Sequence, residues 1–356
     1  MCPMAIAMKI RENSKYTAQL REIRELSFLA GKTVLVAGAG GMLGGCLVDA
    51  VLLWNQEQER RCRVVAMGRN RGTLEARFQD SLGDPNFTIA AHDVCHPLED
   101  SLGHVDYIIH GASNADPANM AKYPVDTLLA NVTGTKTLLE YGLSHGMERF
   151  LYVSSGEAYG QPDGELHAFW EDYCGPVDLK NPRSCYPEGK RAAEVLCQSY
   201  GSQYGAQVVI VRPCHLFGPT MAQKDSRAAA EFFWRGARGQ DILLKSAGTT
   251  ERSHCYVVDA VDALLTVLAR GEAGSVYNIA DRRYQMTVRE LAEKAAAAGG
   301  SRVIFQEAGN QEKKKYLAVS RQVLDSARLE KLGWKPLAGT ENAIEDTITI
   351  LREAEK

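Results

Sequence analysis

Short apolar and β-branched runs alternate along this chain with segments long enough to form helices. The runs lie at Thr33–Ala37, Arg63–Met67, Phe87–Ala90, Val105–His110, Phe150–Ser154 and Gln207–Arg212. Strands separated by helix-length segments are typical of a parallel sheet that is covered by helices on both faces. The pattern therefore predicts an α/β fold with a doubly wound parallel sheet.

The residues before the first predicted strand carry a different pattern. Apolar side chains recur there at helical spacing, at Tyr16, Leu20, Ile23, Leu26 and Leu29. The spacing predicts one amphipathic helix from Ser14 to Leu29 that packs on the body of the protein or on a partner subunit. A membrane-surface helix is the weaker interpretation, because Glu22 and Glu25 offset the neighbouring arginines.

At 356 residues the chain is long for one compact core, so we expect two lobes. The helical N-terminal extension would span residues 1–30. The sheet domain would comprise residues 31–212 and 255–280, and a smaller C-terminal α/β lobe for the substrate would comprise residues 213–254 and 281–356. The segment from Gly160 to Pro182 is rich in Pro, Gly and Asp, which predicts a long functional loop.

A glycine-rich turn follows the first predicted strand and leads into an apolar segment, Leu47–Leu53, that is expected to be helical. Gly38 can take the tight turn, Gly41 lets the backbone approach a pyrophosphate, and Gly44 permits close packing of helix on strand. The phosphates would lie at the helix N-terminus, beside Met42 and Leu43. The run predicts a dinucleotide-binding Rossmann unit, although its spacing is G-x-x-G-x-x-G rather than the simplest G-x-G-x-x-G.

A second pattern predicts chemistry. Tyr186 and Lys190 are four residues apart, so on a helix over residues 186–200 they share one face. An ammonium beside the phenol is expected to lower the pKa of Tyr186 from about 10 towards neutrality, which would make Tyr186 a base for a hydroxyl proton. Ser155, at the end of the fifth predicted run, would hold the same hydroxyl in line.

Composition excludes several classes of protein. The chain is 45% hydrophobic and 24% charged, as in ordinary globular proteins. Its net charge of −3 lacks the excess of positive charge that is expected of a nucleic-acid-binding protein. It has no run of eighteen apolar residues that could span a membrane, and Met1–Ile10 is too short for a secretory signal. Nine cysteines without C-x-x-C pairs indicate reduced thiols and a cytoplasmic protein, and no metal site is expected, even at His92, Cys95 and His96.

With these motifs in this order, the chain resembles the extended short-chain dehydrogenase/reductase family, which contains nucleotide-sugar epimerases, dehydratases and decarboxylases. The resemblance runs from about Lys32 to the C-terminal helix. Beyond the motifs above, it rests on His92-Asp93-Val94, His110-Gly111-Ala112-Ser113, Asn131-Val132-Thr133-Gly134-Thr135, Arg212-Pro213, Phe217-Gly218-Pro219, Arg252, Tyr256-Val257-Val258-Asp259, Tyr277-Asn278-Ile279 and Leu332-Gly333-Trp334-Lys335-Pro336.

The resemblance implies a bound nicotinamide dinucleotide. It implies cofactor contacts from Lys190 and the glycine turn, and from Asp93, Val94, Ala112, Asn131 and Pro213. An NAD enzyme usually presents an acidic residue to the adenosine ribose after the second strand, whereas this chain has Arg69. Arg69 could bind the 2′-phosphate of NADP, or stack on adenine with NAD bound. We expect NAD by a narrow margin, because the decarboxylase branch of the family uses it, and NADP is almost equally favoured.

The residues after Ser155 bear on the reaction. Oxidation of a sugar 4-hydroxyl held by Ser155 and Tyr186 gives a 4-ketone that acidifies C5, and Glu157 could act there or orient the ring. Family 4,6-dehydratases commonly carry an acid where this chain has Gly156. UDP-glucuronate decarboxylases instead carry a hydroxyl residue, a small residue and Glu, and the chain resembles them. It resembles this branch also at Arg183-Ser184-Cys185-Tyr186, Ala112-Ser113-Asn114-Ala115-Asp116-Pro117 and Gly218-Pro219-Thr220-Met221.

We therefore predict a redox-neutral enzyme that oxidises the C4 hydroxyl of a nucleotide sugar, in the manner of a UDP-uronate decarboxylase. The resemblance implies substrate contacts from Ser113, Arg227 and Arg252, a UDP-linked substrate and a homodimer. The chain departs from the branch at Asn114, His215 and Thr220, where Pro, Asn and Arg are usual. A 4-epimerase or 4,6-dehydratase is the alternative, and a non-catalytic dinucleotide-binding sensor is a more remote one.

Overall fold

The computed structural model describes residues 3–162, 164, 166–306 and 321–356. Within them, seven parallel strands form one sheet in the order β10-β6-β5-β4-β1-β2-β3. The strands are β1 (Thr33–Ala37), β2 (Arg63–Gly68), β3 (Phe87–Ala91), β4 (Tyr107–His110), β5 (Arg149–Val153), β6 (Val208–Pro213) and β10 (Val276–Ile279). The predicted doubly wound sheet is confirmed, and all six predicted strands are present. The largest shift is the start of β4, at Tyr107 rather than Val105.

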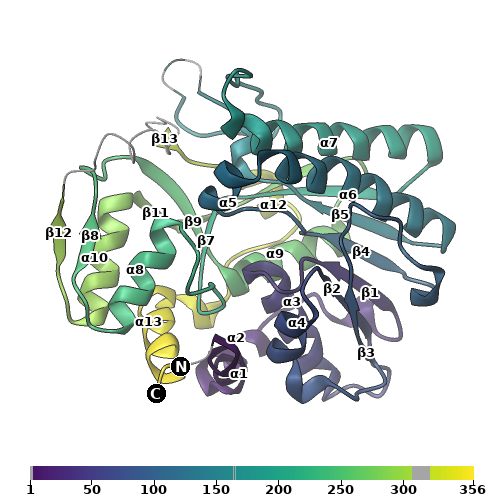
Figure 1. Ribbon diagram of the computed structural model, residues 1–356, viewed down its shortest axis with the longest axis horizontal. Coiled ribbons are helices and arrows are strands. Elements are labelled where there is room, and N and C mark those ends of the chain that lie inside the picture. The colour runs from purple at the N-terminus through teal and green to yellow at the C-terminus, as the bar shows by residue number, and fades with distance from the viewer. Residues whose placement is uncertain (1–2, 163, 165, 307–320) are drawn as a thin grey trace.

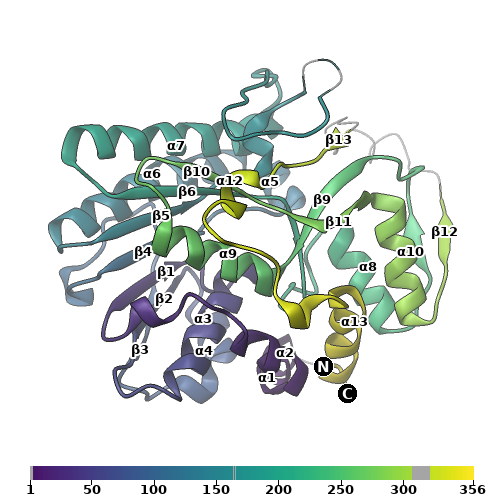
Figure 2. The same ribbon diagram turned by 180° about the vertical axis from the view of Figure 1, so that it is seen from behind.

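The two faces of the sheet pack against different helices (Figures 1 and 2). Val34 and Val36 of β1 belong to a core shared with α3 (Met42–Asn55), α4 (Arg71–Arg77) and α9 (Val257–Arg270). Leu35 and Ala37, which point the other way, pack with α6 (Pro124–Ser144) and α7 (Cys185–Tyr204). Because both faces are buried, the strands are continuous apolar runs in the sequence.

The strand order reverses beside β1. The chain proceeds from β1 to β2 and β3 on one side, and then crosses to β4 and β5 on the other. The carboxyl ends of β1 and β4 therefore flank a crevice, which is where open α/β sheets bind their ligands. The residues that immediately follow these strands are the first candidates for a site.

A second group of elements lies to one side of the large sheet (Figure 1). Its strands are β7 (His215–Phe217), β8 (Ile242–Leu244), β9 (Glu251–Tyr256), β11 (Asp281–Thr287), β12 (Val303–Phe305) and β13 (Arg321–Gln322). Its helices are α8 (Ala228–Ala237), α10 (Val288–Gly299) and α13 (Ala343–Ala354), while the short helices α5 (Pro117–Lys122) and α12 (Ala327–Glu330) lie nearer the large sheet. Nearly all of the second group comes from the residues expected to form the smaller lobe.

The predicted long loop runs over residues 160–181 without a helix or strand in its described part, and residues 163 and 165 lie outside the described residues. Phe169 in this loop pairs with Leu324, so the loop contacts the segment that follows β13. The loop ends where a 3₁₀ turn at Pro182–Ser184 leads into α7.

The prediction of one N-terminal helix from Ser14 to Leu29 is partly wrong. The segment forms α2 (Ser14–Arg21), and α1 (Pro3–Glu12) precedes it. The helix ends at Arg21, and three residues later the Arg24 N–H donates to the Asp262 carboxylate at 2.9 Å. The predicted apolar residues are nevertheless buried, and the Tyr16 hydroxyl donates to Asp49 at 3.0 Å. The extension therefore packs on the body of the protein.

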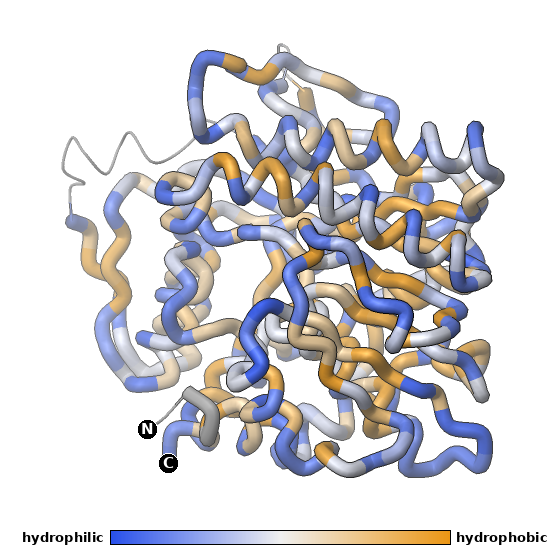
Figure 3. The backbone as a smooth tube through the Cα atoms, turned by 45° about the vertical axis from the view of Figure 1, so that its right-hand side comes forward, coloured by the Kyte–Doolittle hydropathy of each residue, from blue (hydrophilic) through white to orange (hydrophobic). Residues whose placement is uncertain are grey.

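Hydropathy follows this arrangement. Figure 3 shows hydrophobic segments concentrated in the interior and hydrophilic segments along the outer loops. Among the described residues, no helix has the length and apolar character needed to cross a membrane.

Candidate active site

The glycine turn joins β1 to α3 at the carboxyl edge of the sheet. Gly38 has a φ of +93°, and a Cβ there would lie 2.8 Å from the Gly111 carbonyl carbon. A Cβ at Gly44 would lie 2.4 Å from the Gly38 carbonyl oxygen, so a larger residue would push the helix off the turn. Gly41 immediately precedes α3, whose first turn leaves backbone N–H groups without helical partners, including those of Met42 and Leu43.

A cavity of about 530 Å³ lies beside this turn. Its walls come from the residues that follow β1, β2, β3 and β4, and from α6. The predicted site residues that line it are Gly38, Gly41, Arg69, Asp93, Val94, Ala112 and Ser113. The Ser113 hydroxyl is buried without a hydrogen-bond partner among the described residues, so the cavity offers a polar group to a ligand. Its position and lining fit a nucleotide.

Arg69 and Asn114 are joined across this cavity. The Arg69 Nη2 donates to the Asn114 side-chain oxygen at 3.1 Å, and the Asn114 amide donates to the Thr127 hydroxyl at 3.3 Å. Asn114 stands where the decarboxylase pattern usually has Pro, so one departure from that pattern orients the residue expected to contact the adenosine ribose. The cavity residues that follow β2 are Arg69 and Asn70, and neither is a carboxylate.

The structure brings Ser155, Tyr186 and Lys190 together at the carboxyl end of β5. Tyr186 and Lys190 lie on α7 as predicted, and both are buried. The Lys190 amine donates to the Val153 carbonyl at 2.7 Å and lies 5.6 Å from the centre of the Tyr186 ring. Ser155 follows β5 directly, and its hydroxyl is close enough to the Tyr186 phenol to act on its pKa.

The expected lowering of the Tyr186 pKa is wrong for this arrangement. Burial, reinforced by the Glu157 carboxylate, raises the pKa of the Tyr186 phenol to about 12, while the Ser155 hydroxyl and nearby arginines act in the opposite direction. Burial also lowers the pKa of the Lys190 ammonium to about 7. The Lys190 amine lies against the Tyr186 ring and donates to a backbone carbonyl. It therefore does not lower the pKa of the phenol, as the sequence spacing suggested it would.

Glu157 is joined to Arg183, a residue for which the sequence predicted no catalytic role. The Arg183 Nη2 lies 2.9 Å from each oxygen of the Glu157 carboxylate. Glu157 lies in the 3₁₀ turn that follows Ser155, and its backbone N–H donates to the Ser155 hydroxyl at 3.1 Å. Arg183 lies in the 3₁₀ turn before α7, 26 residues after Glu157, so no pattern in the sequence signalled this pair.

Asn131 and Pro213, two further predicted cofactor residues, do not line the cavity. Asn131 is buried, its amide donates to the Thr127 carbonyl at 2.8 Å, and its oxygen accepts from the Tyr152 hydroxyl at 3.1 Å. Tyr152 in turn lies under Lys190, with 4.9 Å between the amine and the ring centre. Pro213 ends β6, and its carbonyl lies 3.5 Å from the point that a Cβ at Gly156 would occupy. These residues surround the carboxyl end of β5 instead.

The predicted substrate residues are divided between two places. Ser113 lines the cavity, whereas Arg227 and Arg252 do not. Arg227 precedes α8, pairs with Asp225, and is close enough to Tyr186 to act on its pKa. Arg252 lies on β9, opposite Gln322 of β13. Both arginines therefore belong to the second group of elements, beside the large sheet, rather than to the large sheet itself.

Two departures from the family pattern have defined surroundings. The His215 Nε2 hydrogen-bonds the Gln322 side-chain oxygen at 2.9 Å. Burial, together with the positive charge of Arg252, holds the pKa of His215 well below its usual range, so the ring is neutral. The Thr220 hydroxyl donates to the Met42 carbonyl at 3.1 Å, and it therefore touches the glycine turn.

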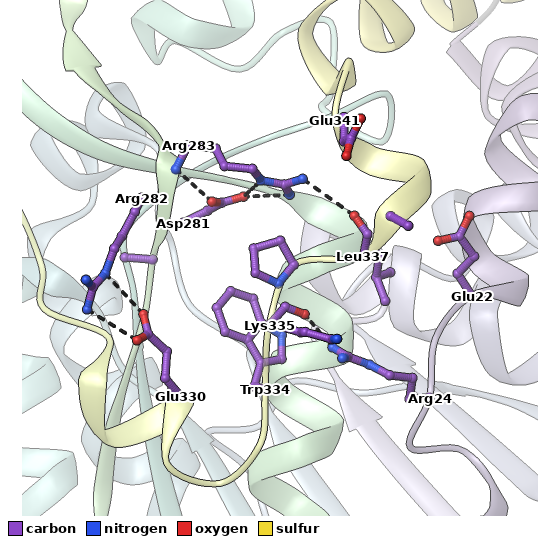
Figure 4. Close-up of a pocket in the computed structure, with 13 residues that line it drawn as sticks. Glu22, Arg24, Asp281, Arg282, Arg283, Glu330, Trp334, Lys335, Leu337 and Glu341 are labelled. Atoms are coloured by element: carbon purple, nitrogen blue, oxygen red, sulfur yellow. Dashed lines mark hydrogen bonds and ion pairs between the residues drawn. The ribbon is translucent and has the colours of Figure 1, made fainter.

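A second hollow, of about 640 Å³, lies away from this site (Figure 4). It is bounded by Glu22 and Arg24 of the N-terminal extension, by β11, and by the segment around Trp334. Its arginines are paired, as Figure 4 shows for Arg283 and Asp281. None of the predicted site residues lines it, so its larger volume does not make it the active site.

The fold and the Ser/Tyr/Lys set beside a glycine-turn cavity define an enzyme of the short-chain dehydrogenase/reductase type. A family model described as the NAD dependent epimerase/dehydratase family matches residues 34–280. The chain belongs to this family, which confirms the predicted resemblance and the prediction of an NAD-dependent enzyme.

Curated relatives and solved structures are similar to the chain over most of its length. It is 31% identical to UDP-glucuronic acid decarboxylase 1 of Danio rerio, over 96% of this chain and 78% of that protein. It is 36% identical to UDP-glucuronic acid decarboxylase 3 of Arabidopsis thaliana, over 73% of this chain and 72% of that protein. The structure of UDP-glucuronic acid 4-epimerase from Bacillus cereus, in complex with UDP-glucuronic acid and NAD, has a TM-score of 0.74 at 20% identity, covering 90% of this chain and 99% of that one.

Proposed function

We propose that this protein is a redox-neutral UDP-glucuronate decarboxylase with bound NAD. The observation that carries the proposal is the Glu157 carboxylate beside Tyr186, following Ser155 with only Gly156 between them. A uronate oxidised at C4 is a β-keto acid, which loses carbon dioxide without a strong acid catalyst. The reaction therefore needs a base and an oriented ring, and it does not need the extra acid that a dehydratase carries at the position of Gly156.

The residues divide this work as follows. Ser155 holds the sugar 4-hydroxyl in line, and Tyr186 takes its proton and later returns it. Lys190, held at the end of β5, supports the same pocket, and Glu157 orients the ring at C5. Arg227 and Arg252 of the smaller lobe bind the nucleotide part of the substrate, which carries negative charge. The glycine turn would hold NAD, which would supply hydride transfer to and from the sugar C4.

The cavity residues support NAD as the cofactor. Gly38 and Gly44 leave room where a Cβ would collide with backbone, and the unpartnered Ser113 hydroxyl lies in the cavity. Asp93 and Val94 would contact the adenine, and Ala112 would contact the phosphates or ribose. Arg69, held by Asn114, would stack on the adenine or contact the ribose.

The reaction is tested by product mass. Wild-type protein incubated with UDP-glucuronate should give a product that has lost carbon dioxide. The Tyr186→Phe variant removes the titrating oxygen and keeps the ring, so its turnover should fall by about 10²-fold while NAD binding changes little. A six-carbon product of unchanged mass would instead identify a 4-epimerase, and loss of water a 4,6-dehydratase. Tyr186→Phe turnover within a few-fold of wild type would remove Tyr186 from the mechanism.

The role of Arg69 is tested by cofactor affinity. With NAD as the cofactor, Arg69→Ala should weaken NAD and NADP binding to a similar extent through lost adenine stacking, by about 1 kcal/mol. The control is Arg61→Ala, which lies before the opposite end of β2 and should leave both affinities unchanged. A loss of about 2 kcal/mol for NADP with no change for NAD would indicate a 2′-phosphate contact and would contradict NAD as the preferred cofactor.

We also propose that the protein is a homodimer through α6 and α7. Exposed apolar side chains on these helices include Val125 (64% exposed), Leu128 (37%) and Val195 (65%). The two helices lie side by side on an outer face of the protein (Figure 1), and such a patch suits a symmetric contact with a second copy.

The dimer is tested by light scattering in solution. Wild-type protein should have the mass of two chains. Val195→Asp should have the mass of one chain, because a dimer of the variant would bury one charge from each copy in the contact. Leu179→Asp changes a residue of the long loop that is 77% exposed, and it should leave the dimer intact. A monomeric wild type would refute this interface.

A further inference from the structure

Arg183 is placed by the turn that begins α7. Its backbone N–H donates to the Asn181 side-chain oxygen at 2.9 Å, which fixes the turn at Pro182–Ser184. From there the side chain reaches the Glu157 carboxylate, with 2.9 Å from Nη2 to each oxygen. The two side chains are only 15% and 23% exposed, so solvent screens their attraction less than it screens a surface pair.

The side-chain contacts of Arg183 join two candidate catalytic residues. Its hydrogen bonds within the described part of the chain go to Glu157, and its guanidinium carbon lies 5.8 Å from the centre of the Tyr186 ring. The Nη1 group is buried and has no hydrogen-bond partner among the described residues. A buried donor without a partner costs stability, so this arginine is not optimised for structural support.

Arg212 provides the contrast. It donates from Nε and Nη2 to the Glu194 carboxylate, at 2.9 and 2.6 Å, and from Nη1 to the Glu171 carbonyl at 2.8 Å. All three of its nitrogen groups have partners, as expected of an arginine that ties a loop to a strand and a helix. Arg183, by contrast, leaves its Nη1 group without a partner among the described residues, and it lies three residues before Tyr186, the proposed base.

The pair also bears on the charge around Tyr186. The Glu157 carboxylate raises the pKa of Tyr186 beyond the effect of burial, and Arg183 acts in the opposite direction. The charged and titratable groups that face this phenol come from several elements: Glu157, Arg183, Arg227, Lys190 and Tyr152. Among them, Arg183 is the one bonded directly to Glu157.

We propose that Arg183 is a positioning residue. Its guanidinium holds the Glu157 carboxylate beside Tyr186 and offsets the charge of that carboxylate, so Arg183 and Glu157 act as one unit. This inference rests on the proposed function, because it takes Glu157 as part of the catalytic site. Without Arg183, the Glu157 carboxylate is free to turn away from the sugar, and its charge acts on Tyr186 without compensation.

The test is a double-mutant cycle with Glu157→Gln, Arg183→Gln and the double variant. Turnover is measured with whichever nucleotide sugar the wild type converts. Each single variant should lose about 10²-fold in kcat, and the double variant should be no slower than Glu157→Gln within about two-fold, because residues that act as a unit are strongly non-additive. Losses in the double variant that equal the product of the two single losses would overturn the proposal.

The pH profile supplies a second readout, which a purely structural role would not move. In Arg183→Gln the acidic limb of kcat/KM should move to higher pH, because the uncompensated Glu157 carboxylate raises the pKa of Tyr186. In Glu157→Gln and in the double variant it should move to lower pH. An acidic limb that is the same in Arg183→Gln and wild type would contradict the proposal.

A matched control exists elsewhere in the chain. Arg238 donates to both oxygens of Glu355, at 3.1 Å from Nε to each, in a pair that is 31% and 22% exposed. Arg238→Gln removes a comparable ion pair far from Tyr186, so it should leave kcat and the pH profile unchanged. If Arg238→Gln lowered kcat as much as Arg183→Gln does, the loss would be a general effect of destabilisation and the inference would fall.

The outcomes separate this inference from the proposed function. If the wild type converts a nucleotide sugar without loss of carbon dioxide and the cycle is non-additive, the decarboxylase proposal fails and the role of Arg183 stands. If carbon dioxide is lost and the cycle is additive, the decarboxylase proposal stands and the proposed role of Arg183 fails. A wild type that converts no nucleotide sugar would overturn both.

Discussion

The arrangement of the site depends on one hydrogen bond, from the Lys190 amine to the Val153 carbonyl at 2.7 Å. It fixes α7 against the carboxyl end of β5, and by doing so it sets the distance between Tyr186 on the helix and Ser155 after the strand. The amine is buried among aromatic rings. It packs on the ring of Tyr152, whose hydroxyl donates to the Asn131 side-chain oxygen. Burial of an ammonium opposes folding, so this contact brings the helix and the strand together at a cost in stability.

The sequence was sufficient for the sheet because burial on both faces makes each strand a continuous apolar run, as in Val34–Ala37. It was also sufficient for the glycine turn, since Gly38 and Gly44 are demanded by backbone contacts that only glycine allows. The end of the N-terminal helix was not predictable, because the segment after α2 bonds to residues distant in sequence, as the Arg24 N–H does to Asp262. Periodicity cannot report a partner of that kind.

The chemistry was less predictable than the fold. The four-residue spacing of Tyr186 and Lys190 places both on one helix face, but it does not reveal that both are buried. Burial raises the pKa of the phenol and lowers that of the ammonium, and these shifts exceed the attraction expected from spacing alone. The partner of Glu157 was similarly hidden, because Arg183 approaches it only after the long loop has returned to the start of α7. The site therefore buries charged groups in an arrangement that suits the reaction but costs stability.

The most direct test of that account is the stability of Lys190→Met relative to wild type as a function of pH, measured by urea unfolding without added cofactor. Burial lowers the pKa of Lys190 from 10.5 to about 7, so the unfolded chain binds the extra proton between these pH values and wild-type stability falls as pH decreases through that range. Methionine has no such dependence. The stability of the variant relative to wild type should therefore increase by about 2 kcal/mol or more on going from pH 10.5 to pH 7. A difference that does not change with pH, or that changes in the opposite direction, would contradict the claim that the buried amine opposes folding.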